Sequence, residues 1–138
     1  MKKLKVLFLS LLALTTIVSC SKDDDNDSST SGSIEGTWQL TKEGETVKTL
    51  EAVENEGNCG TTTVVFKSDK TYTVTDYYFA ETCRQYSGNG TWEKTGNTLK
   101  LTEDGETSSI EIAELTASTL ITKETDEEGV WYNLYVRK

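Results

Sequence analysis

Residues 90–112 read GTWEKTGNTLKLTEDGETSSIEI, and this stretch decides the fold class. Within it, Asp104-Gly105 is a strong signal for a two-residue hairpin turn, because a type I′ turn requires positive φ at both central residues. Leu99 and Leu101 alternate with polar residues just before that turn. A period of two is typical of a strand with one buried face. The stretch therefore predicts antiparallel β-strands joined by tight turns.

The same alternation continues on both sides of this stretch. Strands are expected over residues 36–41, 61–66, 71–79, 90–94, 98–102, 106–112, 118–123 and 129–137. Asp69-Lys70 predicts a two-residue turn between two of them, and residues 47–53 fit either a strand or a helical turn. About eight short strands without a convincing helix indicate an all-β sandwich or barrel. A small antiparallel barrel is favoured, because closure removes exposed strand edges.

Residues 1–19 have the character of an export signal. Lysines near the start precede a mostly apolar run, residues 6–17, which is too short to span a bilayer. The sequence Ile17-Val18-Ser19-Cys20 resembles the lipobox of bacterial lipoproteins. This resemblance implies cleavage just before Cys20 and a diacylglyceryl group on that residue, which would anchor the chain in a membrane. An ordinary secretory signal with a chance cysteine is the alternative.

A polar tether over residues 20–33 follows the expected cleavage site. No apolar residue occurs between Cys20 and Ile34, so this segment cannot join a core. Its serines and clustered aspartates favour a flexible, extended chain. The run Lys22-Asp23-Asp24-Asp25 is similar to a signal that routes some Gram-negative lipoproteins to the outer face of the outer membrane. We therefore expect an outer-membrane lipoprotein exposed on the cell surface, with the periplasmic leaflet as the alternative.

Composition narrows the function classes. The formal net charge is −9, and an acidic chain repels phosphate backbones, so no nucleic-acid partner is expected. The chain has no histidine, which excludes Ser-His-Asp and Cys-His catalysis and removes the commonest metal ligand. Carboxylates cluster at residues 103–105 and 126–128, but without the spaced ligands of a calcium loop, so solvated turns are expected there. We expect neither an enzyme nor a metal or cofactor.

Three cysteines are present, and the lipobox accounts for one of them. Cys59 and Cys83 then form an even pair in an oxidising compartment, which predicts a disulfide. A hairpin turning at Asp69-Lys70 would bring the two cysteines together at its open base. A reactive thiol is the alternative, although the chain offers no histidine to activate one.

The order of motifs in residues 34–138 resembles the lipocalin-like domain of many Gram-negative lipoproteins. Gly36-Thr37-Trp38 is similar to the lipocalin signature, in which the tryptophan plugs the closed end of an eight-stranded barrel. The other matching landmarks follow in the family's order: Cys59, residues 64–66, 68–72, Cys83, 90–92, 96–99 and 112–120. One departure is Lys70, since the family's turn usually reads Asp-Gly and lysine tolerates positive φ less well.

The resemblance implies a monomeric binding module for a small apolar or amphipathic molecule. Aromatic side chains are the candidates to line a pocket, although filling the core is the more common role for any one of them. The aromatic segment at residues 76–79, near Cys83, is the best candidate for the barrel mouth. The wider set is Trp38, Phe66, Tyr72, Tyr78, Trp92, Trp131, Tyr132 and Tyr135, and the chosen ligand-binding residues are Tyr72, Tyr78, Phe79, Trp92 and Tyr132. The alternative is a structural lipoprotein with a filled barrel that contacts another envelope protein or a glycan.

Overall fold

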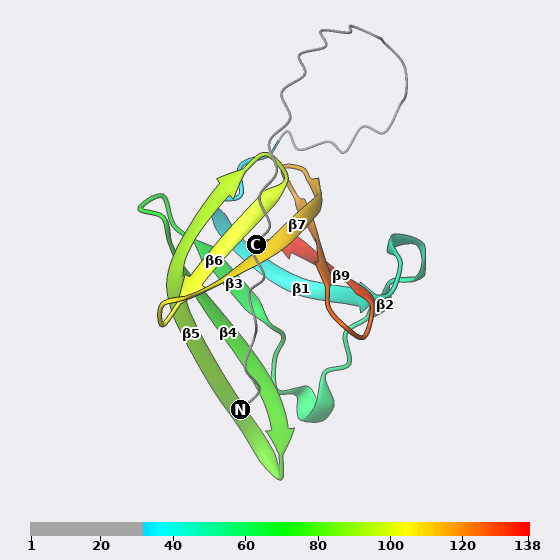
Figure 1. The fold of residues 1–138 in the computed structure, drawn as a ribbon. Helices are drawn as coiled ribbons and strands as arrows, with labels where there is room; N and C mark the ends of the chain where they lie inside the picture. The colour runs from blue at the N-terminus through cyan, green and yellow to red at the C-terminus, as the bar shows by residue number, and fades with distance from the viewer. Residues whose placement is uncertain (1–31) are drawn as a thin grey trace, which may run out of the picture.

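The computed structural model describes residues 32–138, which form an all-β barrel (Figure 1). The eight barrel strands are β1 (Gly36–Gly44), β3 (Thr63–Phe66), β4 (Thr71–Ala80), β5 (Thr82–Thr95), β6 (Thr98–Glu103), β7 (Glu106–Leu115), β8 (Thr119–Thr125) and β9 (Val130–Arg137). Residues 47–53 contain both expected alternatives, since the 3₁₀ helix η1 (Val47–Thr49) precedes the short strand β2 (Glu51–Ala52). A second 3₁₀ helix, η2, covers Glu56–Asn58.

Antiparallel pairing closes the barrel. Consecutive strands pair with each other from β3 through to β9, and β1 pairs with both β3 and β9. Trp38 of β1 therefore lies opposite Val64 on one side and Arg137 on the other. This closure confirms the eight-stranded barrel that the sequence predicts. No helix within residues 32–138 is long and apolar enough to cross a membrane.

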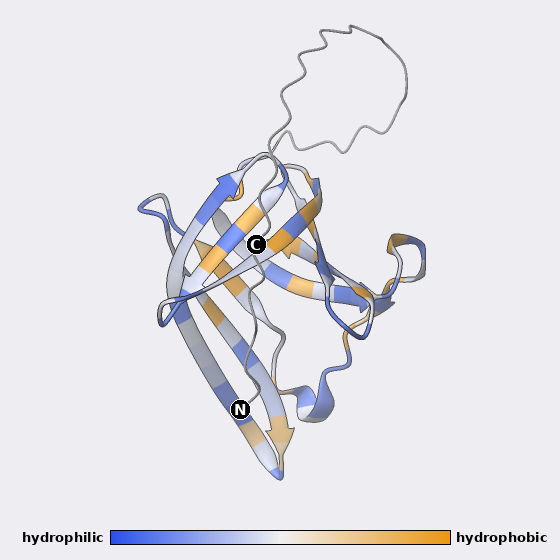
Figure 2. Ribbon diagram, viewed as in Figure 1, coloured by the Kyte–Doolittle hydropathy of each residue, from blue (hydrophilic) through white to orange (hydrophobic). Residues whose placement is uncertain are grey.

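One end of the barrel is filled by a hydrophobic core. Figure 2 shows apolar and polar residues alternating along β6, as the period of two requires. Trp38 is fully buried among Leu99, Ile112, Leu115 and other core residues. We call this end the closed end, because a cluster of buried side chains fills it. Trp38 thus occupies the plug position that the family resemblance implies.

The two predicted hairpin turns had different outcomes. Asp104 and Gly105 both have positive φ, 51° and 85°, and they join β6 to β7 as predicted. The prediction of a two-residue turn at Asp69-Lys70 was wrong, because four residues separate the end of β3 at Phe66 from the start of β4 at Thr71. The Asp69 carboxylate accepts hydrogen bonds from the Thr71 hydroxyl and N–H, and these bonds lower the pKa of Asp69.

The longest hairpin, β4–β5, was predicted only in part. The sequence indicates a strand from Gly90, whereas β5 begins at Thr82. The outer half of this hairpin, which we call the blade (residues 76–87), extends beyond the rest of the barrel (Figure 1). Nearly all blade residues are exposed or half-buried on both faces, so residues 82–87 show no alternation for a sequence pattern to detect.

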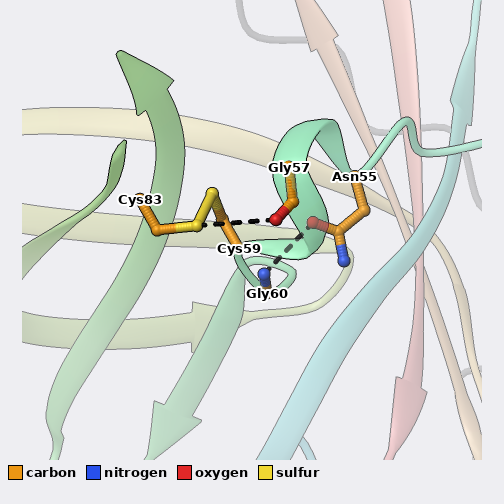
Figure 3. The surroundings of a disulfide bond; sticks show 5 residues. All are labelled: Asn55, Gly57, Cys59, Gly60 and Cys83. Carbon is orange, nitrogen blue, oxygen red and sulfur yellow. Dashed lines mark hydrogen bonds between the residues drawn. A yellow bond between two sulfur atoms is a disulfide. The ribbon is translucent and has the colours of Figure 1, made fainter. Parts of the chain in front are cut away.

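A disulfide joins Cys59 and Cys83, with 5.1 Å between their Cα atoms (Figure 3). The pair is the predicted one, but its place in the fold differs. Cys83 lies inside β5, opposite Phe79, rather than at the open base of a β3–β4 hairpin. The bridge therefore fastens the segment before β3 onto the blade.

The expected signal peptide (residues 1–19), Cys20 and the Lys22–Asp25 run lie outside the described residues. The last two residues of the expected tether are described, and both contact the barrel. The Gly32 N–H donates to the Leu115 carbonyl at 3.3 Å, and the Ser33 carbonyl accepts a hydrogen bond from Arg137. The chain therefore enters the barrel at its closed end.

Candidate functional site

A pocket of about 570 Å³ opens at the end of the barrel opposite Trp38. We call it the calyx. Its wall is lined by side chains from β3, β4, β5, β6 and β9, namely Val64, Tyr72, Val74, Tyr86, Leu101, Glu103 and Tyr135, together with Thr62. Its rim is formed around the β6–β7 turn by Asp104 and residues 106–108.

The strand register explains why these side chains point inward. Residues directly opposite each other in an antiparallel ladder lie on the same face of the sheet. Buried Trp38 is opposite Val64, which is opposite Val74, which in turn is opposite Gly88. The same rule places Leu101 on the face of buried Trp92. The side chains of the calyx and of the core thus project from the same, inner face of the sheet.

Two glycines of β5 make room inside the barrel. Gly88 is buried, and a Cβ atom there would lie 2.5 Å from Glu103 Oε1 and 3.2 Å from Val74. A Cβ atom at Gly90 would overlap the Thr102 carbonyl oxygen and lie 2.9 Å from the Tyr72 ring. The absence of side chains on this part of β5 therefore gives space to the Glu103 carboxylate and the Tyr72 ring.

Tyrosines and carboxylates supply the polar groups of the calyx. The Tyr72 hydroxyl donates to Glu103 Oε2 at 3.5 Å, and burial, followed by the charge of Glu103, raises the pKa of Tyr72. Burial also raises the pKa of Tyr135 far above its ordinary range, with further contributions from Glu124, Asp76 and Glu43. A buried phenol beside negative charge keeps its proton, so it remains a hydrogen-bond donor.

A comparison of the sequence with protein-family models gives the same fold as the structure. Residues 34–122, more than half of the chain, match the family model described as a lipocalin-like domain. The chain belongs to the lipocalin-like domain family. No curated protein sequence matches this lipocalin-like chain significantly.

Solved structures show the same fold. A lipocalin-like protein from Bacteroides uniformis superposes with a TM-score of 0.54 at 12% identity, covering 76% of this chain and 98% of that one. An uncharacterized protein from Bacteroides eggerthii gives 0.50 at 12% identity, covering 75% and 98%. Japanin from Rhipicephalus appendiculatus, solved bound to cholesterol, gives 0.50 at 15% identity, covering 74% of each chain. At these identities the likeness shows the fold alone.

The lipocalin-like barrel separates the five candidate ligand residues. Tyr72 alone among them lines the calyx. Trp92 is 5% exposed at the closed end, where its indole N–H donates to the Lys67 carbonyl at 3.0 Å and its ring packs edge-on against Phe66. Tyr132 lies opposite Gly44 and Lys123, on the face of β9 away from buried Asn133.

Tyr78 and Phe79 lie on the blade, which places them outside the calyx. They are 53% and 47% exposed and line a separate pocket of about 300 Å³ with Cys59 and Gly60. Beside that pocket, Asn55 Oδ1 accepts the Gly60 N–H at 3.1 Å (Figure 3). The aromatic segment was expected at the barrel mouth, but the structure places Tyr78 and Phe79 beyond it, on the blade.

The sequence reasoning missed most of the calyx. Tyr135 belongs to the wider aromatic set, but Tyr86 carries no sequence signal, because no alternation marks its part of β5. Glu103 was expected in a solvated turn, and this was wrong, since it lines the calyx. Its signal was available: Glu103 continues the period of two set by Leu99 and Leu101. Within residues 32–138, no group of three potential His, Cys, Asp or Glu ligands converges to hold a metal ion.

Proposed function

We propose that this chain is a lipid-anchored outer-membrane protein whose lipocalin-like domain binds one small apolar or amphipathic molecule in the calyx. The observation that carries the proposal is the calyx itself. Its volume of about 570 Å³ lies within the range of roughly 300–1,000 Å³ typical of small-molecule pockets. Aromatic and aliphatic side chains with a few polar groups are also the usual lining of such sites.

Two further observations support a binding role over a filled barrel. The glycines at positions 88 and 90 keep space open where side chains would otherwise project inward. Japanin, a protein of the same fold, is known in a structure with bound cholesterol, which supports an apolar ligand for a barrel of this kind. The proposed role is binding without catalysis.

A calyx-filling substitution tests the proposal. We expect purified protein to bind the neutral apolar probe N-phenyl-1-naphthylamine, with fluorescence enhancement on binding. Leu101→Trp should weaken that binding by at least about tenfold, roughly 1.4 kcal/mol, because the larger ring occupies the calyx. Lys100→Trp places the same ring on the exposed outer face and should leave binding unchanged.

Thermal unfolding of both variants shows whether the barrel is retained. Absence of probe binding by the wild-type protein, or equal binding by the two variants, would contradict a ligand site in the calyx. Native mass spectrometry of the purified protein can then identify any ligand retained from the cell.

The membrane location is part of the same proposal. Residues 1–19 would be removed, Cys20 would carry the lipid, and Lys22–Asp25 would direct the protein to the cell surface. Each buried CH₂ group contributes about 0.8 kcal/mol, so two or more acyl chains hold a soluble domain firmly. The dozen residues from Cys20 to Gly32 span at most about 40 Å when fully extended. This reach would keep the domain close to the membrane surface.

Cys20→Ala is expected to abolish lipidation and to release the protein from membranes. The lipobox motivates this prediction, because Cys20 is its acceptor residue. Membrane fractionation followed by a carbonate wash measures the retained protein. Cys83→Ala is a useful control, since it removes a cysteine from the barrel and should leave membrane retention intact. An alanine variant at position 20 that stays with the membrane after the wash would show that the anchor lies elsewhere.

A further inference from the structure

We infer that the calyx selects a cationic amphiphile, a molecule with a primary ammonium group on an apolar body. This inference rests on the proposed binding function and specifies its ligand class. It follows from the signs of the charges around the calyx and from the position of one carboxylate in its wall.

The residues that line the calyx are acidic and never basic. Glu103, Asp104 and Glu106 are among them, and no lysine or arginine is. The next inward-facing position of β5 beyond Tyr86 is Arg84, but it lies exposed on the blade, outside the calyx lining. A cation entering the calyx would therefore meet negative charge at the rim and again in the wall.

The Glu103 carboxylate is half-buried in the wall of the calyx. Its side chain occupies the space left by Gly88, 2.5 Å from where a Cβ atom would sit, and it accepts the Tyr72 hydroxyl. Tyr86 lines the same pocket. A carboxylate in a pocket that also holds tyrosine rings suits an ammonium group, which can gain both an ion pair and contact with an electron-rich ring face.

A second set of carboxylates lies toward the open end of the barrel. Glu124, Asp76 and Glu43 come from three different strands, Glu124 and Asp76 are exposed, and all three add to the effect of burial in raising the pKa of Tyr135. A field that disfavours a phenolate favours a cation in the same place. In the part of the chain that the structure describes, the two ion pairs are Lys70–Glu35 and Lys123–Glu111, so none of these three carboxylates is paired with a lysine or arginine.

A matched series of dodecyl ligands tests the inference with the purified protein. Dodecylamine, dodecanol and dodecanoate share one apolar chain and differ in head-group charge. Isothermal titration below their critical micelle concentrations should show the amine binding at least about tenfold more tightly than the alcohol, and the carboxylate most weakly. An equal affinity for all three, or tightest binding of the carboxylate, would overturn the inference while leaving the proposed function intact. If none of the three binds, the proposed function itself fails.

A charge-matched pair of variants locates the effect. Glu103→Gln should weaken dodecylamine binding by roughly five- to tenfold and change dodecanol binding by less than about twofold. Glu93→Gln removes the same charge from the exposed outer face of β5 and should change neither affinity. Equal losses in the two variants would show that net charge, and not the calyx, attracts the amine, and would overturn the inference. The wild-type ratio of amine to alcohol affinity decides the question even if a variant fails to fold.

Discussion

Trp38→Ala is expected to lower the free energy of unfolding by about 3–5 kcal/mol. The indole is completely buried at the closed end, and its N–H donates to the Ile34 carbonyl at 2.7 Å. The Arg137 guanidinium lies 4.2 Å from the ring centroid. Alanine would leave a cavity, an unpaired carbonyl and a guanidinium without its aromatic partner. Urea unfolding followed by circular dichroism measures the loss.

Two variants separate the causes. Trp38→Phe keeps most of the packing but removes the N–H donor, so it should cost about 1–3 kcal/mol. Trp131→Ala removes the same side chain from a site that is 42% exposed and should change stability by no more than about 0.5 kcal/mol. If Trp38→Ala proved as mild as Trp131→Ala, Trp38 would not be the plug of the closed end.

Removing the disulfide is the second large effect. The double variant Cys59→Ser, Cys83→Ser should lose about 3 kcal/mol, because the bridge closes a loop with a sequence separation of 24 and restricts the unfolded chain. For a domain of this size, that loss corresponds to a fall in Tm of roughly 12–25 °C. Differential scanning calorimetry of the exported protein, with and without the substitutions, measures it.

The same variant should loosen one region more than the rest. The bridge fastens η2 onto the blade, where Gly57 packs against the Phe79 ring and Gly60 against Tyr77. Amide hydrogen exchange should therefore accelerate in residues 54–60 while the closed end stays protected. Uniform acceleration would mean that the bridge stabilises the whole barrel equally. Labelling of both thiols in the folded, exported wild-type protein would show that no bridge forms.

The elements of the fold were predictable where one face of a strand is buried. Leu99 and Leu101 alternate with polar residues because both project into the barrel interior, and Asp104-Gly105 forms the expected turn with positive φ at both residues. The blade escaped detection because it projects into solvent and has no buried face to impose a pattern. The turn before Thr71 was misjudged because the Asp69 side chain, by capping Thr71, stabilises a longer loop.

The candidate site was far less predictable. Tyr72 and Trp92 have similar sequence surroundings, yet one lines the calyx and the other fills the closed end. The difference is their height along the barrel, which depends on the stagger between strands. Single-strand alternation separates inside from outside, but it carries no information on stagger. Calyx residues contributed by five strands could therefore be assembled only once the register was known.

The entry of the chain at the closed end has a consequence for how a ligand would reach the protein. Gly32 joins the barrel beside Leu115, whereas the calyx rim lies at the other end of β7, near Glu106. Ten residues of strand separate the two ends, roughly 30 Å. With the proposed anchor at residue 20, the tether would leave the barrel at the end opposite its opening. A barrel standing upright on that tether would exchange its proposed ligand with the surrounding aqueous phase rather than with the lipid beneath.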